Sequence, residues 1–485
     1  MKFPGCYNNN NNKQRVLGLA LVLTTCTQAI DLDVNDAASI KATTRTIAQT
    51  LTSYYTSPDN ENRDIPGLLP DKYYWYEAGA LFNSLITYWH YTSDTQYNTL
   101  TRLALRHQSG DKENFMPLNQ TNTIANDDQA YWAHAAMTAA ETRFPTHDDD
   151  NNNDDDSDPS WLDLARAAFD TQTARWDNTT CDGGLRWQIY TFGAGYNYKN
   201  SASNGAFFAL AARLARYAGA NDETYARWAD AAWEWSTRVG LVVEEDEEGD
   251  GNGNGNGTYV YDGASAVEDC GSVNRLQWTA YAGWYVLGAA YMYNRTNHPT
   301  WRTRLQSLTT GLSIFYPDND TNPNEPNEPT NQILTEPACE PQNTCTTDQK
   351  SYKASLAHTL GTTLQLAPFL ESALLPRMRA SAVAAARTCV RGEEEEEEEE
   401  ARECGFVWTA SSGNETYGVG EQMGALNAVQ SLLALGSAGP GVGGEGDGEG
   451  DGEGGDNNND NNNDGGDNNN DAPSCIHPII SAMGI

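Results

Sequence analysis

The chain is poor in basic residues and lacks long apolar runs. Its 485 residues include 30 lysines and arginines against 67 acidic residues, so the formal net charge is −37. This balance argues against nucleic acid as a partner, because nucleic-acid binding needs basic patches. No stretch reaches the roughly 18 consecutive apolar residues of a transmembrane helix. We therefore expect no membrane-spanning segment.

Patterns typical of metal sites are also missing. None of the nine cysteines has Cys-x2-Cys spacing, and the seven histidines contain no His-x-x-x-His pair. Zinc sites usually depend on such short spacings. The sequence therefore predicts neither a metal ion nor another cofactor.

The acidic surplus is concentrated in a few segments. Residues 148–158, 244–250, 393–400 and 441–471 hold 31 of the 67 acidic residues and no lysine or arginine, which leaves about −6 for the rest of the chain. Runs of this kind are typical of solvated, disordered loops. We expect long acidic and Asn-rich insertions in a mildly acidic globular body.

The amino terminus has the pattern of a secretory signal. Lys13 and Arg15 precede an apolar run from Val16 to Leu23, and small residues around Ala29 provide a cleavage site. We predict a signal peptide over residues 1–29 and a protein that is secreted, extracellular or associated with a cell wall. Six Asn-x-Ser/Thr sequons fit this route: Asn119, Asn178, Asn256, Asn294, Asn319 and Asn414.

The carboxyl-terminal tail matches a lipid-anchor signal only poorly. Small residues near Asn470 resemble an anchor-attachment site, but the tail from Ser474 to Ile485 is short and is interrupted by His477 and Pro478. An anchor signal needs about 10–20 hydrophobic residues at this place. We therefore favour a secreted or wall-associated protein over a lipid-anchored one, with membrane contact only through such an anchor.

Helical periodicity recurs twelve times between residues 36 and 436, whereas sustained period-two alternation is nearly absent. The linkers alternate irregularly between short and long, and the low-complexity inserts fall within them. One closed ring of six helix pairs explains this pattern better than several small bundles. The predicted organisation is an all-α domain over residues 30–436 and a Gly/Asp/Asn-rich tail over residues 437–485. The expected helices span residues 36–56, 74–92, 95–107, 126–142, 159–176, 203–217, 222–239, 276–293, 299–315, 349–366, 372–390 and 421–435.

Two adjacent carboxylates stand at the start of one expected helix. Asn126 has the character of an N-cap, and Gln129 can complete a capping box. Asp127 and Asp128 would then occupy the first turn, with carboxyl groups roughly 5–6 Å apart, close to the separation in retaining glycosidases. Acidic residues are also common there because they complement the helix dipole. The pair therefore has two interpretations, a catalytic dyad or a helix start.

Aromatic residues gather near the expected helix ends, in polar, Gly-rich surroundings such as Gly183 to Gln188. Tyrosine and tryptophan rings suit stacking on sugars as well as packing in a core. Their coincidence with these loops favours a sugar-binding groove. The aromatic residues are Trp75, Tyr76, Trp89, Trp132, Trp187, Trp233, Trp235 and Trp278.

Several blocks in a fixed order carry a resemblance to a known family. They include Tyr73-Tyr-Trp-Tyr-Glu-Ala-Gly-Ala80, Asn126-Asp-Asp-Gln-Ala-Tyr-Trp132, Gly183-Gly-Leu-Arg-Trp-Gln-Ile189 and Thr347-Asp-Gln-Lys-Ser-Tyr-Lys353. Over about residues 36–436 the chain is similar to glycoside hydrolase family 76, the α-1,6-mannanases, and especially to its fungal cell-wall members. The resemblance implies an (α/α)6 barrel, a retaining mechanism and α-1,6-linked mannose as the substrate.

The resemblance also implies residue roles. Asp127 matches the family's nucleophile and Asp128 its general acid/base, although the residues alone permit the reverse. Two carboxylates this close cannot both ionise easily, so one titrates low and the other high. The matching blocks supply five candidates for lining the groove, each of which could equally serve packing or bind buried backbone: Trp187, Asn204, Asp262, Gln277 and Trp278.

Disulfides and partners follow from the same resemblance. It implies the pairs Cys181–Cys270, Cys339–Cys345 and Cys389–Cys404, which leaves Cys475 without a partner. The implied substrates are α-1,6-mannan or the mannose-containing core of a glycolipid anchor. The acceptor is either water or a glucan, and transfer to glucan would make the protein a transglycosylase of cell-wall assembly.

Two other interpretations stay open on the sequence. A catalytically inactive mannan-binding or wall-scaffold protein on the same fold would keep the aspartates as helix caps. An inverting glycosidase would need carboxyl groups more than about 6.5 Å apart.

Overall fold

The computed structural model describes residues 29–147, 158–218, 222–245, 257–317, 332–390, 402–409 and 416–441. The first 28 residues of the expected signal peptide, most of the acidic insertions, Cys475 and the carboxyl terminus lie outside these ranges. None of the helices in the described ranges combines the length and the apolar character that crossing a bilayer requires.

Twelve α-helices occur in the described part of the chain, as the periodicity predicts, and their ends lie within about five residues of those expected. The helices are α1 (Ala37–Thr56), α2 (Trp75–Thr92), α3 (Asn98–Ser109), α4 (Asn126–Thr142), α5 (Trp161–Thr173), α6 (Ser201–Ala215), α7 (Thr224–Arg238), α8 (Thr279–Thr296), α9 (Pro299–Gly311), α10 (Tyr352–Leu366), α11 (Glu371–Thr388) and α12 (Val419–Gln430).

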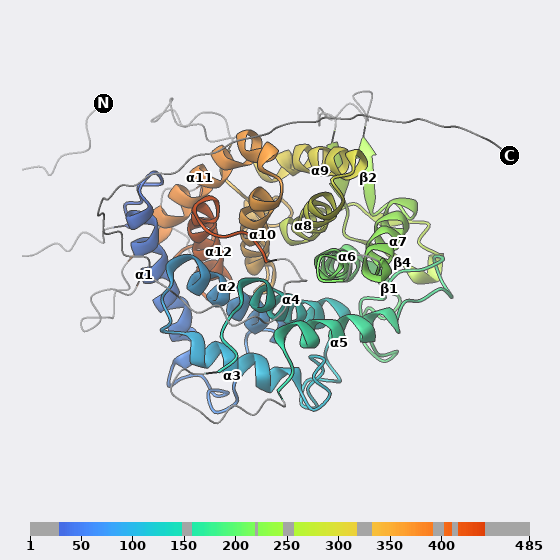
Figure 1. Ribbon diagram of the computed structural model, residues 1–485, viewed down its shortest axis with the longest axis horizontal. Helices are drawn as coiled ribbons and strands as arrows, with labels where there is room; N and C mark the ends of the chain where they lie inside the picture. The colour runs from blue at the N-terminus through green and yellow to red at the C-terminus, as the bar shows by residue number, and fades with distance from the viewer. Residues whose placement is uncertain are drawn as a thin grey trace, which may run out of the picture. The chain divides into compact units, whose positions relative to one another are not determined.

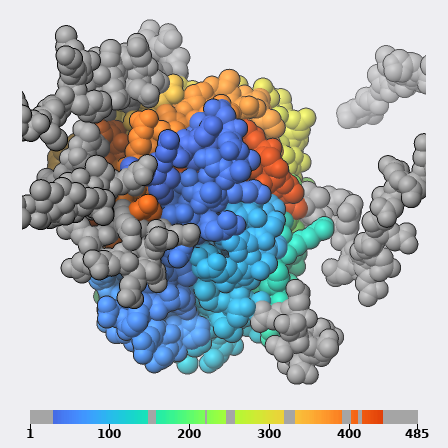
Figure 2. Space-filling model, turned by 90° about the vertical axis from the view of Figure 1, so that its left-hand side faces the viewer, coloured from blue at the N-terminus to red at the C-terminus, as the bar shows by residue number. Residues whose placement is uncertain are grey.

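The helices form an (α/α)6 barrel (Figure 1). The even-numbered helices contact one another in turn, and α12 returns to α2, so that they make a closed inner ring. The odd-numbered helices pack around the outside of this ring. The first and last helices meet where the ring closes, and Figure 2 shows the blue start of the chain beside its orange and red end. The predicted fold class is confirmed.

Small residues allow the inner helices to pack this closely. Every residue of α6 and of α12 is buried. Where α6 meets α8, a Cβ atom at Gly288 would lie 2.4 Å from the ring of Phe208, so only glycine fits at that position. The outer helix α7 buries one face only, as the apolar periodicity of an amphipathic helix predicts.

Two small sheets accompany the helices, and the sequence pattern did not predict them. One is antiparallel and contains β1 (Tyr198–Asn200), β4 (Gly263–Ser265) and β5 (Val273–Asn274); the other pairs β2 (Val242–Glu245) with β3 (Gly257–Val260). Strands of two to four residues are too short for alternation to be visible. The first sheet joins the segments that precede α6 and α8.

The three expected disulfides are present. Cys181 pairs with Cys270, Cys339 with Cys345, and Cys389 with Cys404. The first pair ties the loop before β1 to the segment before α8, across 89 residues of sequence. Bridges over loops of this length restrict the unfolded chain strongly.

The inner helices begin at the same end of the barrel. The ring of Tyr76, at the start of α2, lies 4.8 Å from the ring of Tyr131 in α4. Trp278, which directly precedes α8, packs edge-on against Tyr352 at the start of α10. The backbone N–H of Val419, the first residue of α12, donates to the hydroxyl of Tyr73. The positive ends of these helix dipoles therefore converge.

A segment that follows α12 covers the opposite end of the barrel. His90 Nε2 lies 2.9 Å from the carbonyl oxygen of Ala438, the hydroxyl of Tyr217 donates to Gly441, and the N–H of Gly441 donates to Glu141. The cavity beneath this segment measures only about 30 Å³. This end of the barrel therefore has little space for a bound molecule.

A buried ion pair joins two inner helices near the covered end. Arg213 of α6 donates to both carboxylate oxygens of Glu141 in α4, at 3.2 and 2.7 Å. The same guanidinium contacts His134 Nδ1 and the hydroxyl of Thr138, and Tyr291 of α8 donates to Glu141. Removal of the cation would leave a buried carboxylate without its counter-charge.

We expect Arg213→Met to lower the free energy of unfolding by about 3–5 kcal/mol, because an uncompensated charge stays in the core. Arg213→Met combined with Glu141→Gln should be less destabilised than Arg213→Met alone. Denaturant unfolding measures the effect, with the exposed pair partner Arg45→Ala as a control that costs at most about 1 kcal/mol. Equal losses for Arg213→Met and Arg45→Ala would contradict this account.

Candidate active site

The first turn of α4 carries the two aspartates and is capped differently from the expectation. The helix begins at Asn126, and Ala125 is the residue before it. Asp128 reaches back and accepts the N–H of Ala125 at 2.8 Å. The prediction that Asn126 is the N-cap and Gln129 closes the capping box is therefore wrong by one residue. Gln129 instead donates to the carbonyl of Asn114, 2.7 Å away.

Asn126 uses all of its polar groups to fix this turn. Its N–H donates to the carbonyl of Trp187 at 3.0 Å, and its side-chain amide donates to the carbonyl of Arg186 at 2.8 Å. Arg175 donates to the side-chain oxygen, and Gln172 donates to the backbone carbonyl, both at 2.8 Å. The backbone next to Asp127 is thus held from two sides.

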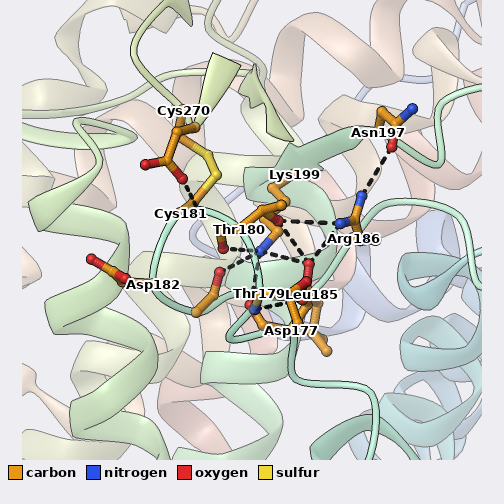
Figure 3. A network of polar contacts seen from close by, with 12 residues as sticks. Asp177, Thr179, Thr180, Cys181, Asp182, Leu185, Arg186, Asn197, Lys199 and Cys270 are labelled. Carbon is orange, nitrogen blue, oxygen red and sulfur yellow. Dashed lines mark hydrogen bonds and ion pairs between the residues drawn. A yellow bond between two sulfur atoms is a disulfide. The ribbon is translucent and has the colours of Figure 1, made fainter. Parts of the chain in front are cut away.

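The loop over residues 177–187, whose carbonyls bind Asn126, is itself fixed by a buried lysine (Figure 3). The ammonium group of Lys199 donates to the carbonyls of Asp177, Thr180 and Gly183, at 3.0, 2.7 and 2.6 Å. It also pairs with the carboxylate of Asp177, which Arg186 approaches to 2.9 Å. The cysteine bridge described above closes the same loop. Sequence reasoning missed this cluster, because a single lysine in a strand gives no signal.

The two carboxyl groups are partly buried. Both side chains keep some accessible surface, yet protein atoms surround them closely. Burial raises the pKa of Asp127 well above its usual range, and the charge of Asp128 raises it further. Burial raises the pKa of Asp128 to about 6, although the N–H of Ala125 lowers it. The two groups therefore share a proton over a wide pH range.

One oxygen of Asp127 faces inwards. Its Oδ1 atom is buried and has no hydrogen-bond partner among the described residues, and the same is true of the hydroxyl of Ser203 in α6. The Ser203 hydroxyl nevertheless lies near enough to lower the pKa of Asp127. Buried polar atoms usually have partners, and these two lie next to each other, so a single donor or acceptor placed between them could satisfy both. A serine in an Ala-rich helix carries no sequence signal of its own.

Two of the five predicted groove residues support the start of α4. Trp187 is half-buried, and its carbonyl accepts the N–H of Asn126. Asn204 is fully buried and bonds both the N–H and the carbonyl of Leu185, at 2.7 and 2.9 Å. Asn204 therefore holds the loop that carries Trp187.

The other three predicted residues lie before α8. Asp262 accepts hydrogen bonds from Tyr198 and Asn274, at 2.8 and 2.7 Å, and burial raises its pKa. Gln277 is half-buried and Trp278 is buried. Asp262 is linked to the loop around Trp187 through Tyr198, whose carbonyl accepts the N–H of Trp187 and whose hydroxyl donates to Asp262.

Tyrosines at the starts of the inner helices connect these groups. Burial raises the pKa of Tyr281, and the charges of Asp262 and Asp127 raise it further, so both carboxyl groups lie near Tyr281. Tyr281 also packs against Tyr352, whose hydroxyl donates to Asp348 at 3.3 Å. Sequence reasoning missed these residues as site components. Their shared position in the first helical turn was the available signal.

A cavity of about 290 Å³ opens beside Asp128. Two segments line it, one that leads into α2 and one that leads into α4. The lining residues are Asn62, Leu68, Leu69, Asp71, Tyr73, Tyr74, Trp75, Gln120, Thr123, Ile124 and Asp128. Asp127 does not line this cavity. The two carboxyl groups therefore have different surroundings.

These features define a class of protein. A helical barrel with two adjacent carboxyl groups of raised pKa, near aromatic residues at the starts of its inner helices, is suited to acid–base and nucleophilic chemistry on a sugar chain. The described residues contain no cluster of three or more potential metal ligands. The chain belongs to glycosyl hydrolase family 76, whose family model matches residues 39–442, and it is a glycoside hydrolase.

Curated relatives agree over most of the chain. The chain is 38% identical over 428 residues to mannan endo-1,6-alpha-mannosidase DCW1 of Saccharomyces cerevisiae, which covers 88% of this chain and 86% of that one. It is 38% identical over 427 residues to a putative mannan endo-1,6-alpha-mannosidase of Schizosaccharomyces pombe, with 87% and 86% covered.

Solved structures share the fold. Dfg5 from Chaetomium thermophilum, crystallised with glucosamine, matches with a TM-score of 0.72 and 34% identity over 84% of this chain and 94% of that one. An inactive α-1,6-mannanase of Salegentibacter, with two consecutive aspartates replaced by asparagine and α-1,6-mannotriose bound, matches with a TM-score of 0.58 at 15% identity, over 82% and 99%. The second likeness concerns the fold alone.

We expect Lys199→Met to lower the free energy of unfolding by about 3 kcal/mol, because three buried carbonyls lose their donor. Glycosidase activity should fall with it, since the loop no longer fixes the start of α4. Thermal unfolding and activity assays check both effects, with the exposed Lys41→Met on α1 as the matched control. An unchanged melting temperature would show that the loop is held by other contacts.

Proposed function

We propose that the protein is a retaining endo-α-1,6-mannosidase, with Asp127 as the nucleophile and Asp128 as the general acid/base. The observation that carries the proposal is the asymmetry of the pair. Asp128 borders the cavity, where a departing sugar and an incoming acceptor can reach it. Asp127 has one oxygen buried near Ser203 of α6, which leaves its other oxygen to form the bond to the anomeric carbon. This arrangement is suited to a nucleophile.

The reaction then takes two steps. Asp127 attacks the anomeric carbon and forms a covalent bond, while the bond to the leaving oxygen breaks and Asp128 protonates that oxygen. In the second step Asp128, now a carboxylate, removes a proton from a water molecule or a sugar hydroxyl. The oxygen so activated attacks the anomeric carbon and releases Asp127. Both steps use the same proton carrier, in opposite directions.

The location of the shared proton depends on the substrate. In the empty site the N–H of Ala125 favours a charged Asp128, whereas the proposed roles need the proton there. A bound sugar changes this balance, because positive charge develops on the anomeric carbon next to Asp127 and stabilises its carboxylate form. The glycosidic oxygen, in turn, accepts a proton from Asp128. The adjacent positions of the two groups allow this redistribution within one site.

The relatives support the substrate and the setting. Those quoted above are named as mannan endo-1,6-alpha-mannosidases, and the Salegentibacter mannanase was crystallised with α-1,6-mannotriose. We propose α-1,6-linked mannan, or the mannose core of a glycolipid anchor, as the substrate at a fungal cell wall. The acceptor is water in hydrolysis and glucan in wall assembly. We further propose that secretion through the predicted signal peptide delivers the enzyme there.

We expect Asp127→Asn to lower turnover of an α-1,6-mannan oligosaccharide at least about 1,000-fold, since no glycosyl–enzyme bond can form. Asp128→Asn should lower it about 100- to 10,000-fold. Mass spectrometry of products, with and without a glucan acceptor, measures both changes. Asp170→Asn, on the exposed side of α5, is the matched control.

The products distinguish the remaining alternatives. Shorter mannosides alone indicate a hydrolase, and mannosyl–glucan adducts indicate a transglycosylase. Azide should restore turnover of a mannosyl fluoride to Asp128→Ala and give an azide of retained configuration. A glycosyl azide of inverted configuration from Asp128→Ala would instead identify Asp128 as the nucleophile and Asp127 as the general acid/base. Mannan binding without any product that depends on Asp127 or Asp128 would instead favour a catalytically inactive mannan-binding scaffold.

The pH profile follows from the shared proton. As the pH rises through about 6, Asp128 loses its proton, while burial and the new charge keep a proton on Asp127. The pair thus holds two protons below about pH 6, one above it and none at high pH. Only the singly protonated pair can attack and donate, so kcat/KM should rise through about pH 6 and fall again at higher pH.

Steady-state kinetics with a mannan oligosaccharide test this profile. In Asp128→Asn assayed with mannosyl fluoride, whose leaving group needs no proton, the high-pH decline should disappear. A wild-type profile that is flat between about pH 5 and 8 would be incompatible with a shared proton.

A further inference from the structure

The cavity beside Asp128 combines the surfaces that sugars require. Leu68, Leu69 and Ile124 lie in its wall but are buried, so polar side chains and aromatic rings provide most of its accessible surface. Tyr74 presents an aromatic ring that is 58% exposed, unusual for so large a side chain. A ring and a polar edge together suit stacking on the face of a hexose. The volume of about 290 Å³ is at the lower limit of small-molecule sites, which are roughly 300–1,000 Å³.

The wall of the cavity is pre-formed. The side-chain amide of Asn62 donates to the carbonyl of Leu69 at 2.9 Å and to the carboxylate of Asp71 at 2.8 Å. The N–H of Asp71 donates to the carboxylate of Glu61. Asn60, which is buried, donates to the carbonyl of Leu68. The loop therefore presents its lining without having to be ordered by a ligand, which lowers the entropic cost of binding.

The charge of the lining is one-sided. It contains the carboxyl groups of Asp71 and Asp128 and no lysine, arginine or histidine among the described residues. The nearby Lys72 lies over the ring of Tyr73, 4.9 Å from its centre, and lines a separate cavity with Glu61. A phosphate group in the cavity would meet negative charge without a counter-ion. An uncharged sugar or an amino sugar would meet no such penalty.

We propose that this cavity binds the sugar whose oxygen Asp128 protonates, first as the leaving group and then as the acceptor, and that it selects uncharged or amino sugars over phosphorylated ones. The proposal rests on the proposed function, because it assigns Asp128 the proton transfer. Tyr74 supplies the stacking face and Asp71 the charge selection. Neither residue was singled out by the sequence as part of a site.

Mannosyl transfer from an α-1,6-mannobiosyl fluoride isolates this step, because fluoride leaves without a sugar in the cavity. Fluoride release reports formation of the glycosyl–enzyme, and transfer products report use of the cavity. The acceptors are methyl glucoside, glucosamine and glucose 6-phosphate at equal concentration. We expect about tenfold less transfer to the phosphate than to the other two, equivalent to about 1.4 kcal/mol.

Two variants assign the residues. Tyr74→Ala should lower the ratio of transfer to fluoride release about tenfold. Asp71→Lys should raise transfer to glucose 6-phosphate relative to methyl glucoside by a similar factor. Phe192→Ala, which removes another exposed ring that does not line the cavity, should leave both ratios as in the wild type. Equal use of the phosphorylated acceptor, or equal effects of Tyr74→Ala and Phe192→Ala, would overturn the proposal.

If the enzyme only hydrolyses its substrate and forms no transfer products, the role of the cavity is tested through its binding of the leaving sugar. The measured quantity is kcat/KM for an α-1,6-mannan oligosaccharide divided by kcat/KM for the mannobiosyl fluoride. Tyr74→Ala should lower this ratio about tenfold compared with the wild type. An unchanged ratio would overturn the proposal. Failure of the proposed function is distinct, because fluoride release would then survive in Asp127→Asn.

Discussion

Asn126 immobilises the start of α4, and the geometry of the site depends on this. Four hydrogen bonds, two from the side chain and two from the backbone, join it to the loop before β1 and to the end of α5. Asp127 and Asp128 follow directly, so their positions depend on that anchorage. The loop in turn depends on the Lys199 ammonium group and on the disulfide between Cys181 and Cys270. A buried cation thus supports two carboxyl groups that it does not contact.

The barrel explains why the carboxyl groups can be buried at all. Isolated carboxylates in an apolar interior lose several kcal/mol of hydration free energy each. The starts of the inner helices direct unpaired N–H groups and the positive ends of their dipoles to the same place, which offsets part of this loss. The remainder appears as raised pKa values in Asp127 and Asp128. The fold therefore stabilises one negative charge at the site more readily than two.

The sequence predicted the fold well, for a physical reason. The inner and outer helices are long enough for apolar periodicity to be visible, and each of the twelve expected helices is present. Strands such as β5, with two residues, are below the length at which any period can be recognised. The three disulfides came from the family resemblance, because spacing alone does not determine which cysteines pair.

The candidate site was predictable only in part. Asp127 and Asp128 could be found, because two acids at a helix start form a local pattern. The N-cap was misplaced by one residue, since Asn126 is needed by a loop about 60 residues away and its side chain is unavailable for capping. Ser203 and Lys199 left no local pattern, because their partners are distant in sequence. Contacts that the fold creates between separate segments cannot be read from a single stretch of chain.

In the proposed mechanism, the choice between hydrolysis and transfer depends on whether water or a sugar occupies the space next to Asp128 in the second step. In the proposed mechanism, the Asp128 carboxylate that remains after the first step removes a proton from the nearest hydroxyl and does not itself distinguish water from a sugar. Discrimination therefore has to come from the walls. The exposed ring of Tyr74 binds water poorly, so a sugar face that stacks on it displaces that water. Under the proposed mechanism, a sugar acceptor would be favoured in proportion to the apolar surface that it covers, so we expect the loop before α2, rather than the two aspartates, to decide between hydrolysis and transfer.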